Sequence, residues 1–155
     1  MSQPNYQLSI NHYIKASPET VWRTMTTQLE SWWCPKPWRT QVDAIEWRSG
    51  GAFNTTMFGP EGETIPGTGV FLEVSPGKRL VFTDALNADW LPQEAFMVGI
   101  LEIQAEGNGT RYTASARHWN QDDLKQHENM GFAQGWQMVA EQLAELAEAA
   151  ERKSA

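Results

Sequence analysis

The sequence predicts an α+β domain in which an antiparallel sheet of six or seven strands curves around a long C-terminal helix. Three observations support this fold class. Apolar and polar residues alternate over 6–15 and again over 110–119, which is the period of a half-buried strand. The glycines within 107–109 separate two such segments, as in a β-hairpin. From 132 to 147, apolar residues instead recur at helical spacing.

Two short helices follow the first predicted strand. Ser17 is suited to cap the first of them, because its hydroxyl can accept a hydrogen bond from a free N–H of the first turn. Pro18 fits the first helical position, and Trp22 lies on the apolar side. A second short helix or turn is predicted over 29–33, and Pro35 ends it.

Six further strands are predicted, separated by turns rich in glycine and proline. Their ranges are 41–47, 53–58, 68–75, 79–84, 96–106 and 110–119. Tyr112 and His118 share one face of the last strand, with small apolar residues between them. Both faces of 70–74 are apolar, so the orientation of Glu73 is open at this point, as is that of Asp84.

The C-terminal helix is predicted to begin at Asn120, a favourable N-cap, with acidic residues in its first turn. Gly131 and Gly135 border its apolar stripe, although a glycine inside a helix costs roughly 1 kcal/mol relative to alanine. Either they allow close packing of helix on sheet, or they leave room for a ligand. We expect the tail over 148–155 to fray.

Length and charge restrict the class of protein. The 155 residues suit one domain, 1–155, with a core over 8–147. A net charge of −7 argues against binding to nucleic acid and to anionic membranes. With neither a signal peptide nor a run of apolar residues of membrane-spanning length, we expect a cytoplasmic location. Cys34 is the single cysteine, so we expect no disulfide within the chain. A homodimer is an open alternative.

Eight tryptophans are more indole than a domain of this size needs to fold, and aromatic side chains are good walls for a cavity that holds an apolar guest. Trp22 and Trp136 lie on helix stripes and are assigned to the core. Trp33, Trp38 and Trp90 lie in connections and are predicted at the rim of such a cavity. The other predicted ligand-binding residues are His12, Met57, Phe71, Phe82, Tyr112, His118 and Phe132.

The sequence contains no standard catalytic motif and no phosphate-binding loop. A metal site built on the three histidines would require them to converge, and we expect neither a metal nor a cofactor. His118 and Glu128 are the side chains considered for acid–base chemistry, because a carboxylate or imidazole in a dry cavity can transfer protons. We consider an enzyme less favoured than a binding protein.

Six segments carry a family resemblance. They are Ala16–Trp22, Trp32–Trp33, Arg48–Phe53, Gly69–Pro76, Arg79–Thr83 and His127–Trp136. In this order they resemble the SRPBCC superfamily, which has the helix-grip fold of START lipid-transfer domains and the birch pollen allergen. Within it the chain looks like the bacterial homologues of the heat-shock-protein-90 ATPase activator.

The resemblance implies a hydrophobic or aromatic small molecule, held between the sheet and the C-terminal helix. One alternative it implies is an enzyme of the polyketide cyclase or hydratase kind that uses the same cavity. Another is an interaction role related to chaperones or to the stress response. The eukaryotic activator contacts the chaperone largely through a second, N-terminal domain, for which these 155 residues have no room. This argues against chaperone activation.

Overall fold

The computed structural model describes residues 5–154 of the chain. It has the predicted α+β class, with eight strands in the described part instead of six or seven. In chain order the elements are β1 (Gln7–Ile14), α1 (Pro18–Thr27), α2 (Leu29–Trp32), β2 (Arg39–Ile45), β3 (Phe53–Phe58), β4 (Thr64–Gly67), β5 (Val70–Ser75), β6 (Arg79–Thr83), β7 (Met97–Glu106), β8 (Gly109–His118), α3 (Gln121–Asn129) and α4 (Phe132–Ser154). None of the helices within residues 5–154 is both long enough and apolar enough to cross a membrane.

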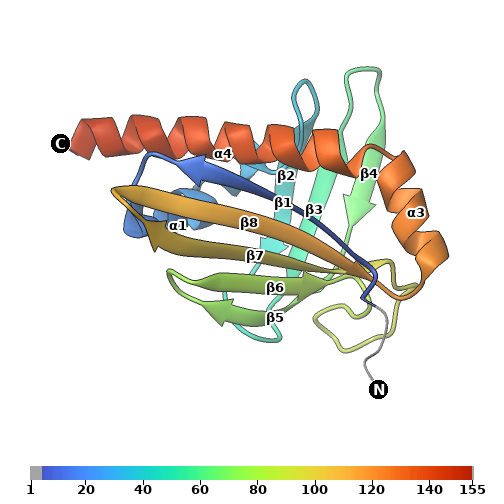
Figure 1. Ribbon diagram of the computed structural model, residues 1–155. Helices are drawn as coiled ribbons and strands as arrows, with labels where there is room; N and C mark the ends of the chain where they lie inside the picture. Colours follow the sequence, from blue (N-terminus) through green and yellow to red (C-terminus); the bar gives the residue numbers. More distant parts are fainter. Residues whose placement is uncertain (1–4, 155) are drawn as a thin grey trace.

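Five strands form the main antiparallel sheet, in the order β1-β8-β7-β6-β5, which lies beneath α4 in Figure 1. The hairpin of β7 and β8 turns where Glu106 pairs with Gly109, as predicted from the glycines there. At the other end of the hairpin, Met97 pairs with His118. Tyr112 and His118 are buried, as are the alanines between them, so this face of β8 forms part of the inner surface.

A second sheet has the order β2-β3-β4. The sequence analysis did not find β4, because its four residues are all exposed and include Pro66, so they show no alternation. The two sheets meet where Ala52 bridges Val70. There the Phe53 N–H donates to the Gly69 oxygen over 3.0 Å, so the two sheets enclose one inner space.

A β-bulge in β5 resolves the orientation of Glu73. The register with β6 shifts between Phe71 and Glu73, which leaves Leu72 as the extra residue. Phe71 is buried, whereas the extra residue Leu72 is exposed. Glu73 then faces outward, and its carboxylate accepts hydrogen bonds from Arg79.

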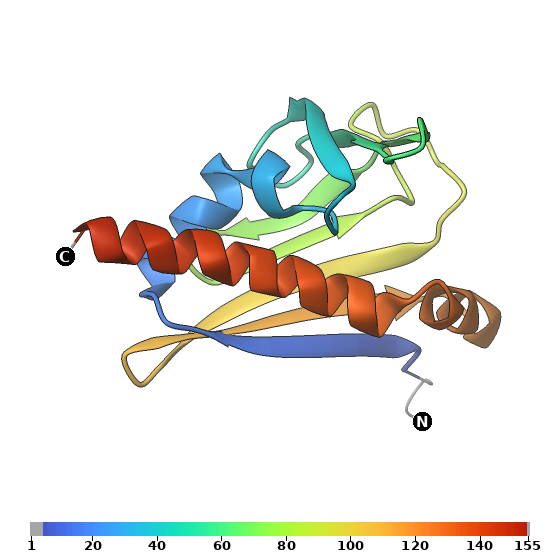
Figure 2. The ribbon, with the colours of Figure 1, turned by 90° about the horizontal axis from the view of Figure 1, so that it is seen from above.

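Helix α4 lies along the inner side of the main sheet and covers it (Figure 2). The prediction that the tail frays is wrong, since α4 continues to Ser154. Two carboxylates hold this end in place. Glu148 accepts a hydrogen bond from the Lys15 N–H over 2.9 Å, and Glu151 accepts one from the Ser17 N–H over 2.5 Å.

A buried amide fastens the middle of α4 to the segment after α2. The Gln142 side chain accepts a hydrogen bond from the Lys36 N–H over 3.0 Å. It also donates to the carbonyl oxygens of Trp32 and Cys34, over 3.3 and 2.9 Å. Cys34 is itself buried and accepts a hydrogen bond from the Thr40 hydroxyl. Burial raises the pKa of the Cys34 thiol, which keeps it protonated and unreactive.

The prediction of a single helix from Asn120 is also wrong, since the segment divides into α3 and α4. Asn120 caps α3 as expected, and its side-chain oxygen accepts from the Asp123 N–H over 2.8 Å. Gly131 has φ of 93°, a left-handed conformation that glycine adopts without strain, and it separates the two helices. Gly135 fits neither explanation offered above. A Cβ there would make an ordinary contact with Pro35, and the residue does not line a cavity.

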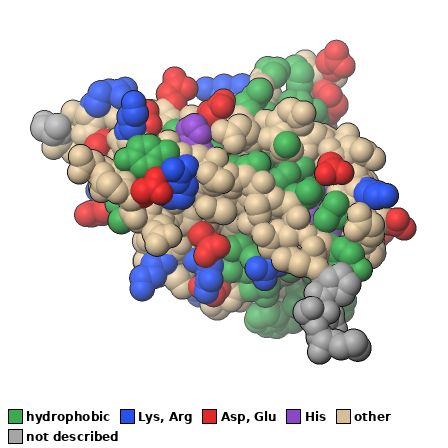
Figure 3. All heavy atoms as spheres, viewed as in Figure 1, with side chains coloured by type: hydrophobic (Ala, Val, Ile, Leu, Met, Phe, Trp, Pro, Cys, Tyr) green, Lys and Arg blue, Asp and Glu red, His purple; other side chains and the backbone are tan. Residues whose placement is uncertain are grey.

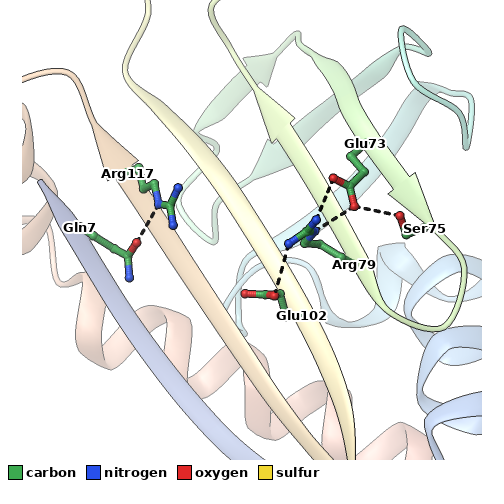
Figure 4. A network of polar contacts seen from close by, with 6 residues as sticks. All are labelled: Gln7, Glu73, Ser75, Arg79, Glu102 and Arg117. Carbon is green, nitrogen blue, oxygen red and sulfur yellow. Dashed lines mark hydrogen bonds and ion pairs between the residues drawn. The ribbon is translucent and has the colours of Figure 1, made fainter. Parts of the chain in front are cut away.

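The outer face of the main sheet is polar. Figure 3 shows charged side chains of both signs interspersed over the molecule in this view. In the network of Figure 4, the Arg79 guanidinium lies between Glu73 and Glu102, and Ser75 donates to Glu73. The hydrogen bonds from Arg79, and then from Ser75, lower the pKa of Glu73. Such exposed ion pairs contribute little to stability, but they make the outer face of the sheet polar and suited to contact with solvent.

Candidate ligand-binding site

A cavity of about 290 Å³ lies between the inner face of the two sheets and the helices α3 and α4. This volume is close to the lower limit for pockets that bind small molecules, which is about 300 Å³. The lining is mostly apolar and comes from most elements of the fold. It consists of Trp33, Phe53, Thr55, Met57, Gly67, Thr68, Gly69, Phe82, Thr83, Asp84, Met97, Leu101, Tyr112, His127, Trp136 and Val139.

Three aromatic rings form a continuous wall of this cavity. The Trp33 ring lies edge to face with Phe53 and with Phe82, at centroid distances of 5.2 and 5.5 Å. Phe53 and Phe82 meet in the same manner at 5.1 Å. Trp33 follows directly after α2, whereas Phe53 and Phe82 point inward from β3 and β6. Edge-to-face pairs of this kind hold one another in fixed positions, so the wall is formed without a guest.

Two polar residues of the lining are Tyr112 on β8 and Asp84 directly after β6. The Tyr112 side chain is almost fully buried in the fold and borders the cavity. Burial raises the pKa of Tyr112, so the hydroxyl stays neutral and can donate. Oδ1 of Asp84 accepts hydrogen bonds from the N–H groups of Phe96 and Met97, over 2.9 and 3.3 Å. These bonds hold the carboxylate at the end of β6.

Two histidines that are distant along the chain form a buried pair. His118, the last residue of β8, has Nε2 2.9 Å from Nδ1 of His127 on α3. His118 Nδ1 lies 3.0 Å from the carbonyl oxygen of Tyr6. Both residues are 7% exposed, and His127 lines the cavity.

Aromatic rings surround this histidine pair. The His127 ring lies 5.0 Å from Phe96, 5.0 Å from Phe132 and 5.7 Å from Trp136, between centroids. Burial, and then the charge that His118 can carry, lower the pKa of His127 to about 4. His127 is therefore neutral near neutral pH and presents an uncharged imidazole to the cavity.

Four of the ten predicted ligand-binding residues line the cavity. They are Trp33, Met57, Phe82 and Tyr112. Met57, Phe82 and Tyr112 lie on strands, and Trp33 lies directly after α2. All four side chains belong to the inner surface of the fold.

Three other predicted residues lie outside the lining. The Trp38 ring packs against Gly59 of the turn after β3. Trp90 is 62% exposed, and its ring lies over Gly50. Phe71 is fully buried behind Phe53, with the two rings stacked at 4.8 Å.

The remaining predicted residues surround the cavity without lining it. His12 Nδ1 accepts a hydrogen bond from Gln137 over 3.2 Å, between β1 and α4. His118 reaches the cavity only through its hydrogen bond to His127. Phe132 packs behind Trp136, at a centroid distance of 4.5 Å. Glu128, the carboxylate considered for acid–base chemistry, is exposed on α3, because the side buried by this helix is that of His127.

Sequence reasoning missed three residues of the lining that matter chemically. His127 is absent from the predicted ligand-binding residues, and Trp136 is assigned to the core, yet both line the cavity. The orientation of Asp84 was left open. The nearest signal in the sequence is Gly131, which permits the turn that folds α3, and with it His127, back onto the end of β8.

The described residues suggest no metal centre. Within residues 5–154, no three side chains of His, Cys, Asp or Glu come together in a way that could hold a metal ion. His118 and His127 converge, but each has its nitrogens directed to a hydrogen bond or to the cavity, and His12 binds Gln137 instead.

Solved structures from bacteria share this architecture. Protein NE0264 from Nitrosomonas europaea is 38% identical, with a TM-score of 0.89 over 94% of this chain and 96% of that one. A protein from Arthrobacter aurescens is 23% identical, with a TM-score of 0.81 over 93% and 87% of the two chains. The AHSA1 protein SPO3351 from Silicibacter pomeroyi is 20% identical, with a TM-score of 0.67 over 89% and 94%. No curated protein matches the chain in sequence.

A family model, "Activator of Hsp90 ATPase homolog 1-like protein", matches residues 15–148, which is most of the chain. The match includes every strand but β1, together with the histidine pair and α4 as far as residue 148. The resemblance to the SRPBCC superfamily and its helix-grip fold is thereby confirmed. The chain belongs to the family of activator of Hsp90 ATPase homolog 1-like proteins.

Proposed function

We propose that the protein is a cytoplasmic binding protein for a hydrophobic or aromatic small molecule, which it holds in the cavity between the sheets and α3 and α4. The observation that carries this proposal is the combination of an aromatic wall with a few polar side chains that border the same cavity. Trp33, Phe53 and Phe82 provide apolar surface, whereas Tyr112 and His127 border the same space. Sites for small molecules have this composition, an apolar lining with a few polar groups that orient the guest.

Binding is tested by calorimetry and by quenching of tryptophan fluorescence, with a panel of uncharged aromatic compounds. Trp33 and Trp136 both line the cavity, so a guest should change their emission. Val139→Phe places a larger side chain in the cavity and should weaken binding at least about tenfold, which corresponds to roughly 1.4 kcal/mol. Val98→Phe on β7 is the matched control, because Val98 does not line the cavity.

Two results would contradict the proposal. One is a panel in which no compound binds, together with purified protein that carries no small molecule detectable by native mass spectrometry. The other is equal affinity in the wild type and in Val139→Phe, which would place the bound compound elsewhere.

The histidine pair provides an observation for a second candidate, an acid–base enzyme of the cyclase or hydratase kind. His127 borders the cavity and could exchange a proton with a guest, with His118 behind it. However, a general base works best when its pKa is near the working pH, and the pKa of His127 is lowered to about 4. An imidazole of this kind accepts hydrogen bonds but is a weak base, so binding is the better supported function. Turnover of a bound compound that is lost in His127→Gln would favour the enzyme instead.

A further inference from the structure

The hydrogen bonds of the histidine pair assign the protons on both rings. A carbonyl oxygen only accepts, so His118 Nδ1, 3.0 Å from the Tyr6 oxygen, must carry a proton. In the neutral ring, His118 Nε2 is then an acceptor. His127 Nδ1, 2.9 Å away, must therefore donate to it. The neutral His127 ring is left with a lone pair on Nε2.

Among residues 5–154, the His127 side chain makes its hydrogen bond through Nδ1 and not through Nε2. His127 is 7% exposed and lines the cavity. No fully buried side-chain nitrogen or oxygen of these residues lacks a partner, so Nε2 is open to the cavity. The tautomer cannot invert at low cost, because a proton on Nε2 in place of Nδ1 would leave two acceptors facing each other across the pair. The Tyr6 carbonyl thus fixes His127 as an acceptor toward the cavity, through His118.

The charges around the cavity have one sign. Among the described residues that line it there is no lysine or arginine, whereas Asp84 is one of them. The Asp84 carboxylate is held in place by Phe96 and Met97, and the rings of Phe96 and Trp136 lie beside His127. An anionic guest would lose its hydration here without gaining a cationic partner, which is costly in an apolar site.

We infer that the cavity selects uncharged aromatic ligands that carry a hydrogen-bond donor, a hydroxylated arene or an aryl amine, whose O–H or N–H donates to His127 Nε2. This inference rests on the proposed function and specifies its ligand class. An arene without a donor would leave the lone pair of His127 desolvated and unpaired. An aromatic carboxylate would in addition place its charge near that of Asp84.

The test compares three probes with one naphthalene frame by isothermal titration calorimetry near neutral pH. They are 2-naphthol, which can donate, 2-methoxynaphthalene, which cannot, and 2-naphthoate, which is anionic. The wild type should bind 2-naphthol about tenfold more tightly than the methoxy compound, as expected for one buried hydrogen bond. 2-Naphthoate should bind most weakly of the three.

Variants assign this preference to the histidine. His127→Phe keeps a ring and removes the lone pair, so the two uncharged probes should bind equally. Because that change leaves His118 Nε2 unpaired, the double variant His118→Phe/His127→Phe, in which both rings are apolar, provides a second measurement. Gln126→Ala, at an exposed position on the same helix, is the control and should retain the wild-type preference.

The outcomes distinguish this inference from the proposed function. If no probe binds the wild type, the inference is wrong, whereas the proposed function fails only if the wider panel and native mass spectrometry also find no ligand. If 2-naphthol and 2-methoxynaphthalene bind the wild type equally, the function stands and the inference is wrong. Tightest binding of 2-naphthoate, or a preference that persists in both histidine variants, would also overturn it.

Discussion

The ring of Phe82 lies across Gly99, its partner on the neighbouring strand, in the space that a Cβ of residue 99 would occupy. Gly99 therefore determines the position of one wall of the cavity, because Phe82 also contacts Trp33 and Phe53 from this position. Glycine in a strand interior often marks such a close approach.

Gly99→Ala should move the Phe82 ring toward the cavity. We expect a loss of about 1–3 kcal/mol in the free energy of unfolding, as for other overpacked cores, and weaker ligand binding. Urea denaturation and calorimetric titration measure the two effects. Unchanged stability would mean that Phe82 has another rotamer available at no cost.

Gly135→Ala should have the opposite effect on stability. This residue lies inside α4, where a Cβ would meet only Pro35 at an ordinary distance of 3.8 Å. Alanine is favoured over glycine in a helix interior by roughly 1 kcal/mol, which corresponds to a rise in Tm of about 2–4 °C for a chain of this size. A lower Tm by calorimetry would show that α4 and the segment around Pro35 are packed more tightly than their distance indicates.

Gln142→Leu should destabilise the fold by about 3 kcal/mol. The substitution removes three hydrogen bonds. The carbonyls of Trp32 and Cys34 lose the Gln142 donor in a buried place, and the Lys36 N–H loses its acceptor in a partly buried one. Glu141→Leu, at an exposed position beside it, should change the free energy of unfolding by less than about 0.5 kcal/mol. Equal effects of the two substitutions in urea denaturation would contradict this role of Gln142.

Stability should fall as the pH falls from about 6.5 to about 4. The folded state disfavours the protonated form of His127, whose pKa is lowered from 6.5 to about 4, whereas the unfolded chain takes up this proton near pH 6.5. The full stability is therefore present above pH 6.5, and on the order of 2–3 kcal/mol is lost by pH 4.

Thermal unfolding over this pH range tests the assignment to His127. His127→Gln cannot titrate, so its stability should depend less on pH between 6.5 and 4.5. The carboxylates with lowered pKa, such as Glu46, Glu73 and Glu151, have an ordinary value of 4.5 and act mainly below this window. An identical pH profile for the variant and the wild type would assign the effect to other groups.

Most elements of the fold could be predicted because each has a local cause. Neighbouring residues determine the alternation in β1 and β8, the cap at Asn120 and the turn at 107–109. The exceptions have non-local causes. β4 exists because β3 pairs with it, and the bulge at Leu72 breaks the period of two that strand prediction uses.

The candidate site could be predicted only where it coincides with the inner faces of strands. Phe82 and Tyr112 were found in this way, whereas the histidine pair was not. No periodicity connects the end of a strand with a residue nine positions later on a helix. The pair depends on the angle between α3 and α4, which follows from the left-handed backbone at Gly131.

The helix break at Gly131 also separates two segments, α3 and α4, whose backbone amides should differ in their protection against hydrogen exchange. Helix α4 buries Ala140, Leu143 and Ala147 against the sheet, so its amides should exchange only when the whole fold opens. In α3, only His127 is buried, so this helix should open at much lower cost. The acceptor of the cavity thus lies on the less protected of the two helices, and a ligand bound to His127 should slow amide exchange in α3 before it does so in α4.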